Sequence, residues 1–448
     1  MNMSRQSVSS RSADTRLPAS LWAATACPAP DYARLREDMI CDTAIVGGGF
    51  TGLSTALHLA LRGQRVIVAE AAEPGWGAAG RNGGQVIAGL KTDPLALIGL
   101  FGADLGARMA GTMGKAADLV FDLIQGYGMD CHARRGGWLQ AAHGPKPYRD
   151  LIQPRYRQWR DLGVDCDLLS AAEIGALIGS APTAYVGGWL DRRGGTLQPL
   201  SYARGLAAAA MREGATILAR TPVHRLRRDE KGWELQADPY KISARRLVLA
   251  TNAYTGMHGD KLIPGIERSI VPVASFQMAT PPLPAKYDGI LPEGLGVTDS
   301  RRLLLYFRRD HTGRLVMGGR SPVDDRPDKA DAVSLRRAVT RIFPQIEVGE
   351  VDFVWSGKVA ISKDKLPHIH MPEVGLISFM GCNGRGVAVC TMMGRILADL
   401  ASGAAAAEVP FPITAPDHFR LHGLRKAGVF ALSKYYSLLD RLESLQRG

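Results

Sequence analysis

The sequence predicts an α/β protein with one Rossmann-like domain and a second domain built on a mixed β-sheet. Three observations support this fold class. A buried strand, a glycine turn and a helix follow one another around residue 50, and a second buried strand ends at residue 70. Further along the chain, the strand patterns at 136–142 and 187–190 indicate a different sheet.

The first glycine turn carries the strongest signal. Gly47, Gly49 and Gly52 follow the strand in G-x-G-x-x-G spacing and open a helix that continues to Ala60. The first glycine permits a tight turn, the second lets a pyrophosphate approach the backbone, and the third brings helix and strand together. Unpaired amides at the helix start favour the phosphates. The next strand ends at Glu70, where an acid is expected on the ribose hydroxyls, so a dinucleotide site is favoured over a purely structural turn.

Two more segments of small residues follow. The loop at 75–85 has almost no bulky side chains, which suits it to lie flat against a ligand. A strand at 374–380 leads through a glycine turn at 381–386 into a long helix that begins at Val387. The amides of this turn can face the O2/N1 side of an isoalloxazine ring, where negative charge collects on reduction. Each segment alone also fits an ordinary turn, but three together favour a flavin over a nicotinamide cofactor.

The remaining elements follow from hydrophobic periodicity. We expect helices at 95–127, 199–212, 335–343 and 433–445, and strands at 215–218, 222–226, 232–235, 246–253, 303–308 and 314–319. The last two strands pair across the turn at 310–313.

The composition is that of a globular protein, with 46% hydrophobic and 22% charged residues in a chain of 448. That length predicts two domains. The net charge of +12 suits an anionic cofactor, an acidic substrate or nucleic acid, although the basic residues are dispersed. The six cysteines form no C-x-x-C pair, which favours reduced thiols and a cytoplasmic location. No apolar run approaches the roughly 18 residues of a membrane-spanning helix; a short apolar segment at 19–27 leaves secretion as an alternative.

Several segments of the chain resemble a known family. The segments at 45–60, 75–85 (GWGAAGRNGGQ), 247–254 (LVLATNAY), 304–319, 355–357 and 381–387 are similar to the FAD-dependent D-amino-acid oxidase superfamily, and most similar to its γ-glutamylputrescine oxidase-like amine oxidases. The resemblance covers about residues 18–445. It implies a discontinuous FAD domain, a β-sheet substrate domain, and oxidation of a small-molecule amine by hydride transfer to flavin N5, with O2 reduced to hydrogen peroxide.

The resemblance also assigns positions to the chain. It implies a disordered tail at 1–17, an arm at 18–39, an FAD domain from 40–94, 196–256 and 355–402, a substrate domain from 95–195 and 257–354, and a C-terminal extension with a helix at 403–448. The residues that it places on FAD are Gly47, Gly49, Gly52, Glu70, Ala79, Gly80, Arg81, Asn82, Gly83, Gly84, Val223, Gly384, Arg385, Gly386 and Val387.

Two departures from the family pattern refine this picture. Covalent members tether FAD through a cysteine near the position of Gly357, and no cysteine lies there, so we expect non-covalent FAD. Sarcosine-oxidase-like members carry a substrate-binding lysine near the position of Ala388. Its absence argues against a simple amino acid bound in that manner.

Three residues are candidates for the chemistry. Lys358 follows Trp355-Ser356-Gly357 and is expected near flavin N5, where a lysine relays protons or attracts superoxide. Tyr306 and Arg308 share one strand face; if that face lines the pocket, Tyr306 bounds the amine and Arg308 pairs with a carboxylate such as that of a γ-glutamyl group. The alternatives are a surface lysine, a packed tyrosine and a solvated arginine. The His368-Ile369-His370 pair lacks a third ligand, so no metal is expected.

Three other functions compete with an amine oxidase. A related flavoenzyme would pass electrons to a quinone instead of O2. A tRNA-associated flavoprotein would explain the basic charge, but the chain has no RNA-binding motif, so no nucleic-acid partner is expected. A nicotinamide-dependent dehydrogenase leaves the Arg81 loop and the Gly384 turn without a purpose. The sequence does not determine the amine or the oligomeric state.

Overall fold

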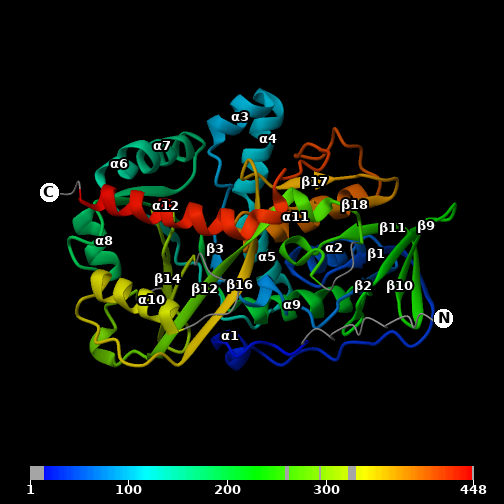
Figure 1. The fold of residues 1–448 in the computed structure, drawn as a ribbon, viewed down its shortest axis with the longest axis horizontal. Coiled ribbons are helices and arrows are strands. Elements are labelled where there is room, and N and C mark those ends of the chain that lie inside the picture. Colours follow the sequence, from blue (N-terminus) through cyan, green and yellow to red (C-terminus); the bar gives the residue numbers. More distant parts are fainter. Residues whose placement is uncertain (1–14, 258–261, 292–293, 321–328, 446–448) are drawn as a thin grey trace, which may run out of the picture.

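The computed structural model describes residues 15–257, 262–291, 294–320 and 329–445, and it contains two large sheets (Figure 1). The tail predicted at 1–17 lies outside the described residues, except for its last three positions. The α/β class, the Rossmann-like domain and the mixed second sheet are all confirmed.

The first sheet has the order β17-β18-β11-β1-β2-β8, with β10 and β9 added beside β11. The strands from β18 to β8 are parallel. The bounds are β1 Met39–Val46, β2 Val66–Ala69, β8 Thr216–Leu218, β9 Arg225–Arg228, β10 Trp233–Ala237, β11 Tyr240–Leu249, β17 His368–His370 and β18 Leu376–Met380. Because parallel strands end at one edge of a sheet, the turns after β1, β11 and β18 come together there.

Helices cover this sheet and form the largest core. They are α2 (Phe50–Ala60), α3 (Pro94–Phe101), α4 (Ala103–Gly114), α5 (Ala116–Tyr127), α9 (Pro199–Arg212) and α11 (Gly386–Ala401). Leu53, Leu206 and Leu397 pack in one buried cluster with Met113 of α4 and Val120 of α5. The helical periodicity at 95–127 is confirmed. The resemblance assigned this segment to the substrate domain, whereas α3–α5 bury their apolar faces against the helices of the first sheet.

The second sheet has the order β16-β12-β15-β14-β13-β4-β6-β5. Its bounds are β4 Trp138–Ala142, β5 Cys166–Ser170, β6 Gly187–Asp191, β12 Ile270–Pro282, β13 Gly296–Asp299, β14 Tyr306–Arg309, β15 Arg314–Arg320 and β16 Phe353–Ser362. Only the β13–β4 pair among these neighbours is parallel. β16 pairs with β12 along its whole length, so this strand of the second sheet extends past the domain boundary predicted at residue 355. The helices α7 (Gln153–Asp161), α8 (Ala171–Ile178) and α10 (Lys329–Ile342) accompany this sheet.

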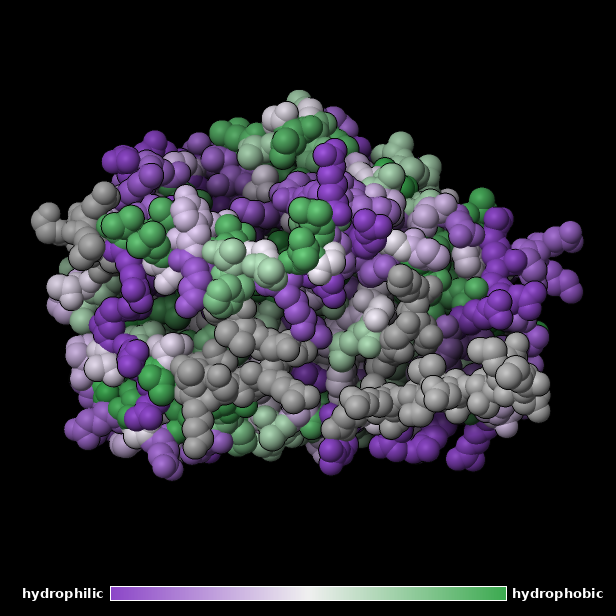
Figure 2. All heavy atoms as spheres, viewed as in Figure 1, coloured by the Kyte–Doolittle hydropathy of each residue, from purple (hydrophilic) through white to green (hydrophobic). Residues whose placement is uncertain are grey.

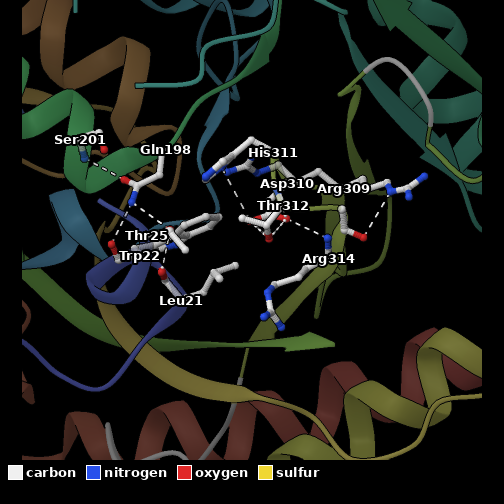
Figure 3. A network of polar contacts seen from close by, with 12 residues as sticks. Leu21, Trp22, Thr25, Gln198, Ser201, Arg309, Asp310, His311, Thr312 and Arg314 are labelled. Atoms are coloured by element: carbon white, nitrogen blue, oxygen red, sulfur yellow. Dashed lines mark hydrogen bonds and ion pairs between the residues drawn. The ribbon is translucent and has the colours of Figure 1, made fainter. Parts of the chain in front are cut away.

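The N-terminal arm joins the two domains through the short helix α1 (Leu21–Thr25). Figure 3 shows Gln198, at the start of α9, donating from Nε2 to the Trp22 carbonyl (2.8 Å) and accepting from the Ser201 amide (2.8 Å). The Trp22 indole packs edge-on against Trp355 of β16, with 5.7 Å between ring centroids. Because Trp22 is fully buried, the arm is part of the core and not a loose extension.

The C-terminal helix α12 (Arg425–Leu445) begins earlier than the predicted residue 433. It crosses in front of β12, β14 and β16 (Figure 1). Leu432, Tyr435, Leu438 and Leu442 are about half exposed, and Figure 2 shows hydrophobic side chains along the path of this helix. Within the described part of the chain, no helix is long and apolar enough to cross a membrane.

Candidate active site

A cavity of about 780 Å³ is the meeting point of the glycine segments. Its wall comes from the turn after β1, the loop at 76–83, the segment at 250–257 after β11, the turn at 382–387, β12, β14, β16 and α12. The predicted residues that line it are Gly47, Gly49, Glu70, Ala79, Arg81, Asn82, Gly83, Val223, Tyr306, Lys358, Gly384, Arg385, Gly386 and Val387. Gly52, Gly80, Gly84 and Arg308 are not part of this wall.

The three glycines of the first turn have different reasons to be glycine. Gly47 has φ +108°, and a Cβ there would lie 3.1 Å from the Ala250 carbonyl. A Cβ on Gly52 would lie 1.9 Å from the Gly47 carbonyl oxygen, so this glycine lets α2 approach the strand. A Cβ on Gly49 would find its nearest neighbour, the Ala79 Cβ, at 3.9 Å. The space in front of Gly49 belongs to the cavity, where a ligand can reach the backbone.

Glu70 stands at the end of β2, at the cavity wall. Its carboxylate accepts hydrogen bonds from the amides of Gly48 (2.6 Å) and Ala72 (2.9 Å). Burial raises the pKa of Glu70, and the amide hydrogen bonds oppose that rise. The carboxylate is therefore held beside the first glycine turn, as a ribose-binding acid requires.

The loop at 75–85 is held by hydrogen bonds to its own backbone and to the first turn. The Gly75 amide donates to the Gly48 carbonyl (2.9 Å). The Asn82 side chain donates to the Ala79 carbonyl (2.7 Å) and accepts from the Gly84 amide (2.8 Å). Asn82 thus closes the loop into one conformation and leaves the Gly83 backbone at the cavity.

The Arg81 side chain lies along the cavity wall. Its Nε donates to the Trp76 carbonyl (2.8 Å), and its guanidinium stacks 4.3 Å from the centroid of the Trp76 ring. A Cβ on Gly357 would lie 3.1 Å from the Arg81 Cβ, so β16 packs closely against this loop.

Arg308 differs from its prediction. We expected its guanidinium to meet a substrate carboxylate, but it lies behind the loop, buried. Nε donates to the Gly83 carbonyl (2.8 Å), Nη2 donates to the Leu197 carbonyl (2.7 Å), and the guanidinium lies 4.8 Å from the Trp22 ring centroid. Burial lowers the pKa of Arg308 to about 10. Alternation placed Tyr306 and Arg308 on one face; Tyr306 lines the cavity, whereas Arg308 lies behind the loop.

Gly80 and Gly84 also stand behind the cavity instead of lining it. A Cβ on Gly80 would lie 2.4 Å from the Gly75 carbonyl oxygen, and one on Gly84 would lie 2.2 Å from the Leu197 carbonyl oxygen. Both residues are small because the loop is tightly packed. The sequence could not separate this requirement from close approach to a ligand.

The second helix start has the predicted form. The turn passes through Gly384, with φ +90°, and α11 begins at Gly386. The Arg385 side chain points away and donates to the carbonyls of Ala88 (3.0 Å) and Leu90 (2.7 Å). Cys382 lies at the cavity, where hydrogen bonding with the Cys390 thiol lowers its pKa.

Two cations at the cavity were missed by sequence reasoning. Both lie close to Gly384. If Gly384 carried a Cβ, that atom would be 3.6 Å from Lys91 Nζ and 3.8 Å from Arg320 Nη2. Burial and the nearby Arg320 hold the pKa of Lys91 well below its usual range, and burial lowers that of Arg320. Across the described ranges, neither side chain has a hydrogen bond or an ion pair to a protein group. Neither residue belongs to a local motif, so no sequence signal would have found the pair.

Lys91 is held from both sides. Arg385 donates to the carbonyls of Ala88 and Leu90, which precede Lys91. Arg155 Nη2 donates to the Lys91 carbonyl (2.7 Å), and the same guanidinium bonds to Asp93 and Gln140. These bonds fix the backbone, so the ammonium group is presented to the cavity.

Tyr306 and Lys358 both reach the cavity. The Tyr306 hydroxyl is 2.9 Å from Ser275 Oγ, and its ring packs on Gly83 and Gly318, where a Cβ would lie 2.8 Å and 2.2 Å away. Lys358 Nζ lies 3.8 Å from Met257 Sδ and 5.8 Å from the Tyr254 ring centroid.

This site fits a flavin dinucleotide. Gly49 to Thr51 offer backbone amides at one helix start, Gly386 and Val387 offer them at another, and Asn82 lies on the wall that they share. The predicted convergence of glycine turns more than three hundred residues apart is therefore present. When bound, FAD supplies a hydride acceptor to this cavity.

The fold and cavity define a two-domain α/β protein whose glycine turns meet at a dinucleotide site. Residues 42–400 match the family described as DAO, FAD dependent oxidoreductase, and the chain belongs to that family. It is accordingly an FAD-dependent oxidoreductase.

Relatives agree with this assignment. The chain is 31% identical to the probable oxidoreductase OrdL of Haemophilus influenzae, over 81% of this chain and 83% of the relative. It is 29% identical to the γ-glutamylputrescine oxidoreductase of Escherichia coli K12, over 96% of this chain and 99% of the relative. The latter match must extend past residue 402 into the C-terminal segment. The crystal structure of glycine oxidase from Geobacillus kaustophilus superposes with a TM-score of 0.69 at 24% identity, covering 84% of this chain and 99% of that one.

The first turn yields a paired prediction. Gly49→Ala should fold normally but bind FAD at least about tenfold more weakly, because the methyl group stands where the pyrophosphate approaches. Gly52→Ala should lower the free energy of unfolding by about 1–3 kcal/mol, because its methyl group meets the Gly47 carbonyl. Thermal unfolding of the FAD-free proteins and FAD titration separate the two effects. Equal behaviour of both variants would contradict this division of roles.

Proposed function

We propose that this protein oxidises the C–N bond of a primary or secondary amine that also carries an acid group, as γ-glutamylputrescine does. The observation that carries the proposal is the Lys91–Arg320 cation pair in the FAD cavity. Both side chains line the cavity and are partly buried, and two neighbouring cations without a protein partner among the described residues are stabilised when an anion joins them. A substrate carboxylate is that anion, since arginine and carboxylate form strong charge-assisted hydrogen bonds.

The pair takes over the role first predicted for Arg308. Tyr306 lines the same cavity as Lys91 and Arg320. Its hydroxyl is anchored by Ser275, so the ring is a fixed surface against which the amine can pack. This chain has Ala388 near the position where sarcosine-oxidase-like members carry a substrate-binding lysine, and Lys91 supplies a cation from another segment.

The reaction balances with water and an electron acceptor. The carbon that bears nitrogen loses a hydride to the flavin and the nitrogen loses a proton, which leaves an imine that water hydrolyses to a carbonyl compound and ammonia or a smaller amine. With O2 as acceptor, the two electrons and two protons appear as hydrogen peroxide. The chain binds and orients the substrate, and the enclosing wall limits access of water.

Lys358 is the residue that we assign to the oxygen step. It lies on β16 within the cavity wall, beside Tyr254 and Met257. A protonated lysine there stabilises negative charge as O2 is reduced. The second candidate keeps the flavin and the amine but uses a quinone as acceptor. FAD is proposed to be non-covalent, because no cysteine lies near Gly357.

The first experiment tests the reaction. Purified protein mixed anaerobically with γ-glutamylputrescine should lose its visible flavin absorbance and regain it in air with formation of hydrogen peroxide. Acid denaturation should release FAD. Putrescine, which lacks the acid group, is the matched control and should bleach the flavin far more slowly. If no amine in a broad series bleaches the flavin, the proposal fails; slow reoxidation by air together with fast reoxidation by a quinone supports the second candidate.

The second prediction concerns the cation pair. Arg320→Gln and Lys91→Met should each raise KM for the acid-bearing amine about 10–100-fold, because a hydrogen bond to a charged group contributes about 1.5–3 kcal/mol. Turnover of amines without an acid group should change little. Lys363→Met, whose native ammonium pairs with Asp417 at the surface, is the control. An unchanged KM in both cavity variants would refute the anionic subsite.

The pH dependence of KM follows from the same pair. The pKa of Lys91 is lowered, so the ammonium loses its proton at a lower pH than an ordinary lysine. KM for the acid-bearing amine should therefore rise as pH increases through that lowered pKa, and the Lys91→Met variant should lack this rise.

A prediction for Lys358 separates oxidation of the amine from reduction of oxygen. Lys358→Met should slow reoxidation of the reduced flavin by O2 by about a hundredfold, because it removes a cation from the site of developing charge. Anaerobic reduction by the amine should keep its rate. Stopped-flow absorbance measures both steps, and an unchanged oxygen rate would remove Lys358 from this role.

A further inference from the structure

The C-terminal helix forms one wall of the FAD cavity. Val429, Leu432, Ser433 and Tyr436 of α12 all line it. Their spacing of three, four and seven residues places them on a single helix face. Tyr435, the residue immediately before Tyr436, is 55% exposed and does not line the cavity. The helix therefore presents one face to the site and another to solvent.

A charged clasp holds this helix in place. Arg302 bonds through its guanidinium to Asp440 (3.1 Å) and Glu443 (2.8 Å). The backbone amides of Arg302 and Leu303 also donate to the two oxygens of Asp440, at 3.1 Å each. The Arg302–Glu443 contact is the first cause of a raised pKa for Arg302 and of a lowered pKa for Glu443. We call Arg302, Asp440 and Glu443 the α12 clasp.

The clasp is connected directly to the cavity. The segment 298–304, which includes Arg302, lines the wall itself. His143 lies behind the clasp, with Nε2 3.5 Å from Glu443 Oε2 and Nδ1 2.7 Å from Ser300 Oγ. His143, Asp440 and Glu443 are close enough together to hold a metal ion, but both carboxylates are already bonded to Arg302. This cluster therefore anchors a helix and is not a metal site.

The α12 wall lies on the side of the second sheet. Tyr436 lines the same cavity as Arg320, one of the two cations of the anionic subsite. The first glycine turn and Val223, at the dinucleotide end, come from the first sheet and its connections, while α12 crosses in front of the strands of the second sheet (Figure 1). Residues 429–436 also lie beyond the segment 42–400 that matches the family.

We propose that α12 is the specificity-determining wall of this enzyme, that Tyr436 contacts the acid-bearing end of the substrate, and that the α12 clasp positions the helix. The inference rests on the proposed function only for the identity of the ligand as an amine with an acid group. It assigns the choice among amines to a helix that forms part of the cavity wall.

The test compares adjacent tyrosines. Tyr436→Ala should lower kcat/KM for γ-glutamylputrescine about tenfold, the range expected when a pocket contact is lost, and should leave short amines nearly unchanged. Tyr435→Ala is the matched control and should alter neither value by more than about twofold. Both variants should retain full FAD content and the visible spectrum of the parent. If Tyr436→Ala and Tyr435→Ala behave alike across the amine series, the inference is overturned while the proposed function stands.

A second measurement does not depend on turnover. The double variant Asp440→Asn with Glu443→Gln should increase hydrogen exchange at the amides of 425–443 and increase quenching of flavin fluorescence by iodide, because the cavity wall is released. Exchange elsewhere should match the parent protein. Unchanged exchange and quenching would overturn the clasp and the wall together. If the parent protein oxidises no amine, the proposed function fails, and these two readouts still decide whether α12 closes the cavity.

Discussion

Three consecutive backbone carbonyls accept hydrogen bonds that hold the two domains together. The carbonyl of Arg81 accepts from the Trp355 indole (3.1 Å) and from Gln277, that of Asn82 from the Trp22 indole (2.8 Å), and that of Gly83 from Arg308 (2.8 Å). The donors come from the arm and from the second sheet, whereas the loop follows the first βαβ unit. Because buried carbonyls need partners, each of these bonds helps to fix where the second sheet sits relative to the glycine turns.

That junction explains why so many small residues occur in one loop. Gly80 and Gly84 allow the loop to close on itself and on Leu197, while Gly83 makes room for the Tyr306 ring. A loop so tightly held presents its backbone to a flat ligand with little loss of entropy on binding. Both close packing and recognition of a flat ligand therefore require small residues at these positions.

Positive charge in the cavity divides into two groups with different uses. Arg385 and Arg155 hold the backbone around residues 88–93, and their side chains are fully engaged. Lys91 and Arg320 remain directed at the cavity. Arg385 and Arg155 fix the backbone that carries Lys91. The proposed anionic subsite therefore depends on residues that need not touch the substrate. The α12 clasp follows the same plan, because Arg302 holds the helix that carries Tyr436.

The sequence alone determined the parts whose chemistry is local. The spacing of Gly47, Gly49 and Gly52, the acid at Glu70 and the turn before α11 depend on short-range geometry, and the structure has each in its expected element. Only the tertiary structure decided which side chains meet. Arg308 turned behind the loop because two buried carbonyls required a donor, and α3–α5 joined the first core because their apolar faces fit there. Lys91, Arg320 and Tyr436 come from a loop, a strand and the final helix, so their approach depends on long-range packing that no local pattern encodes.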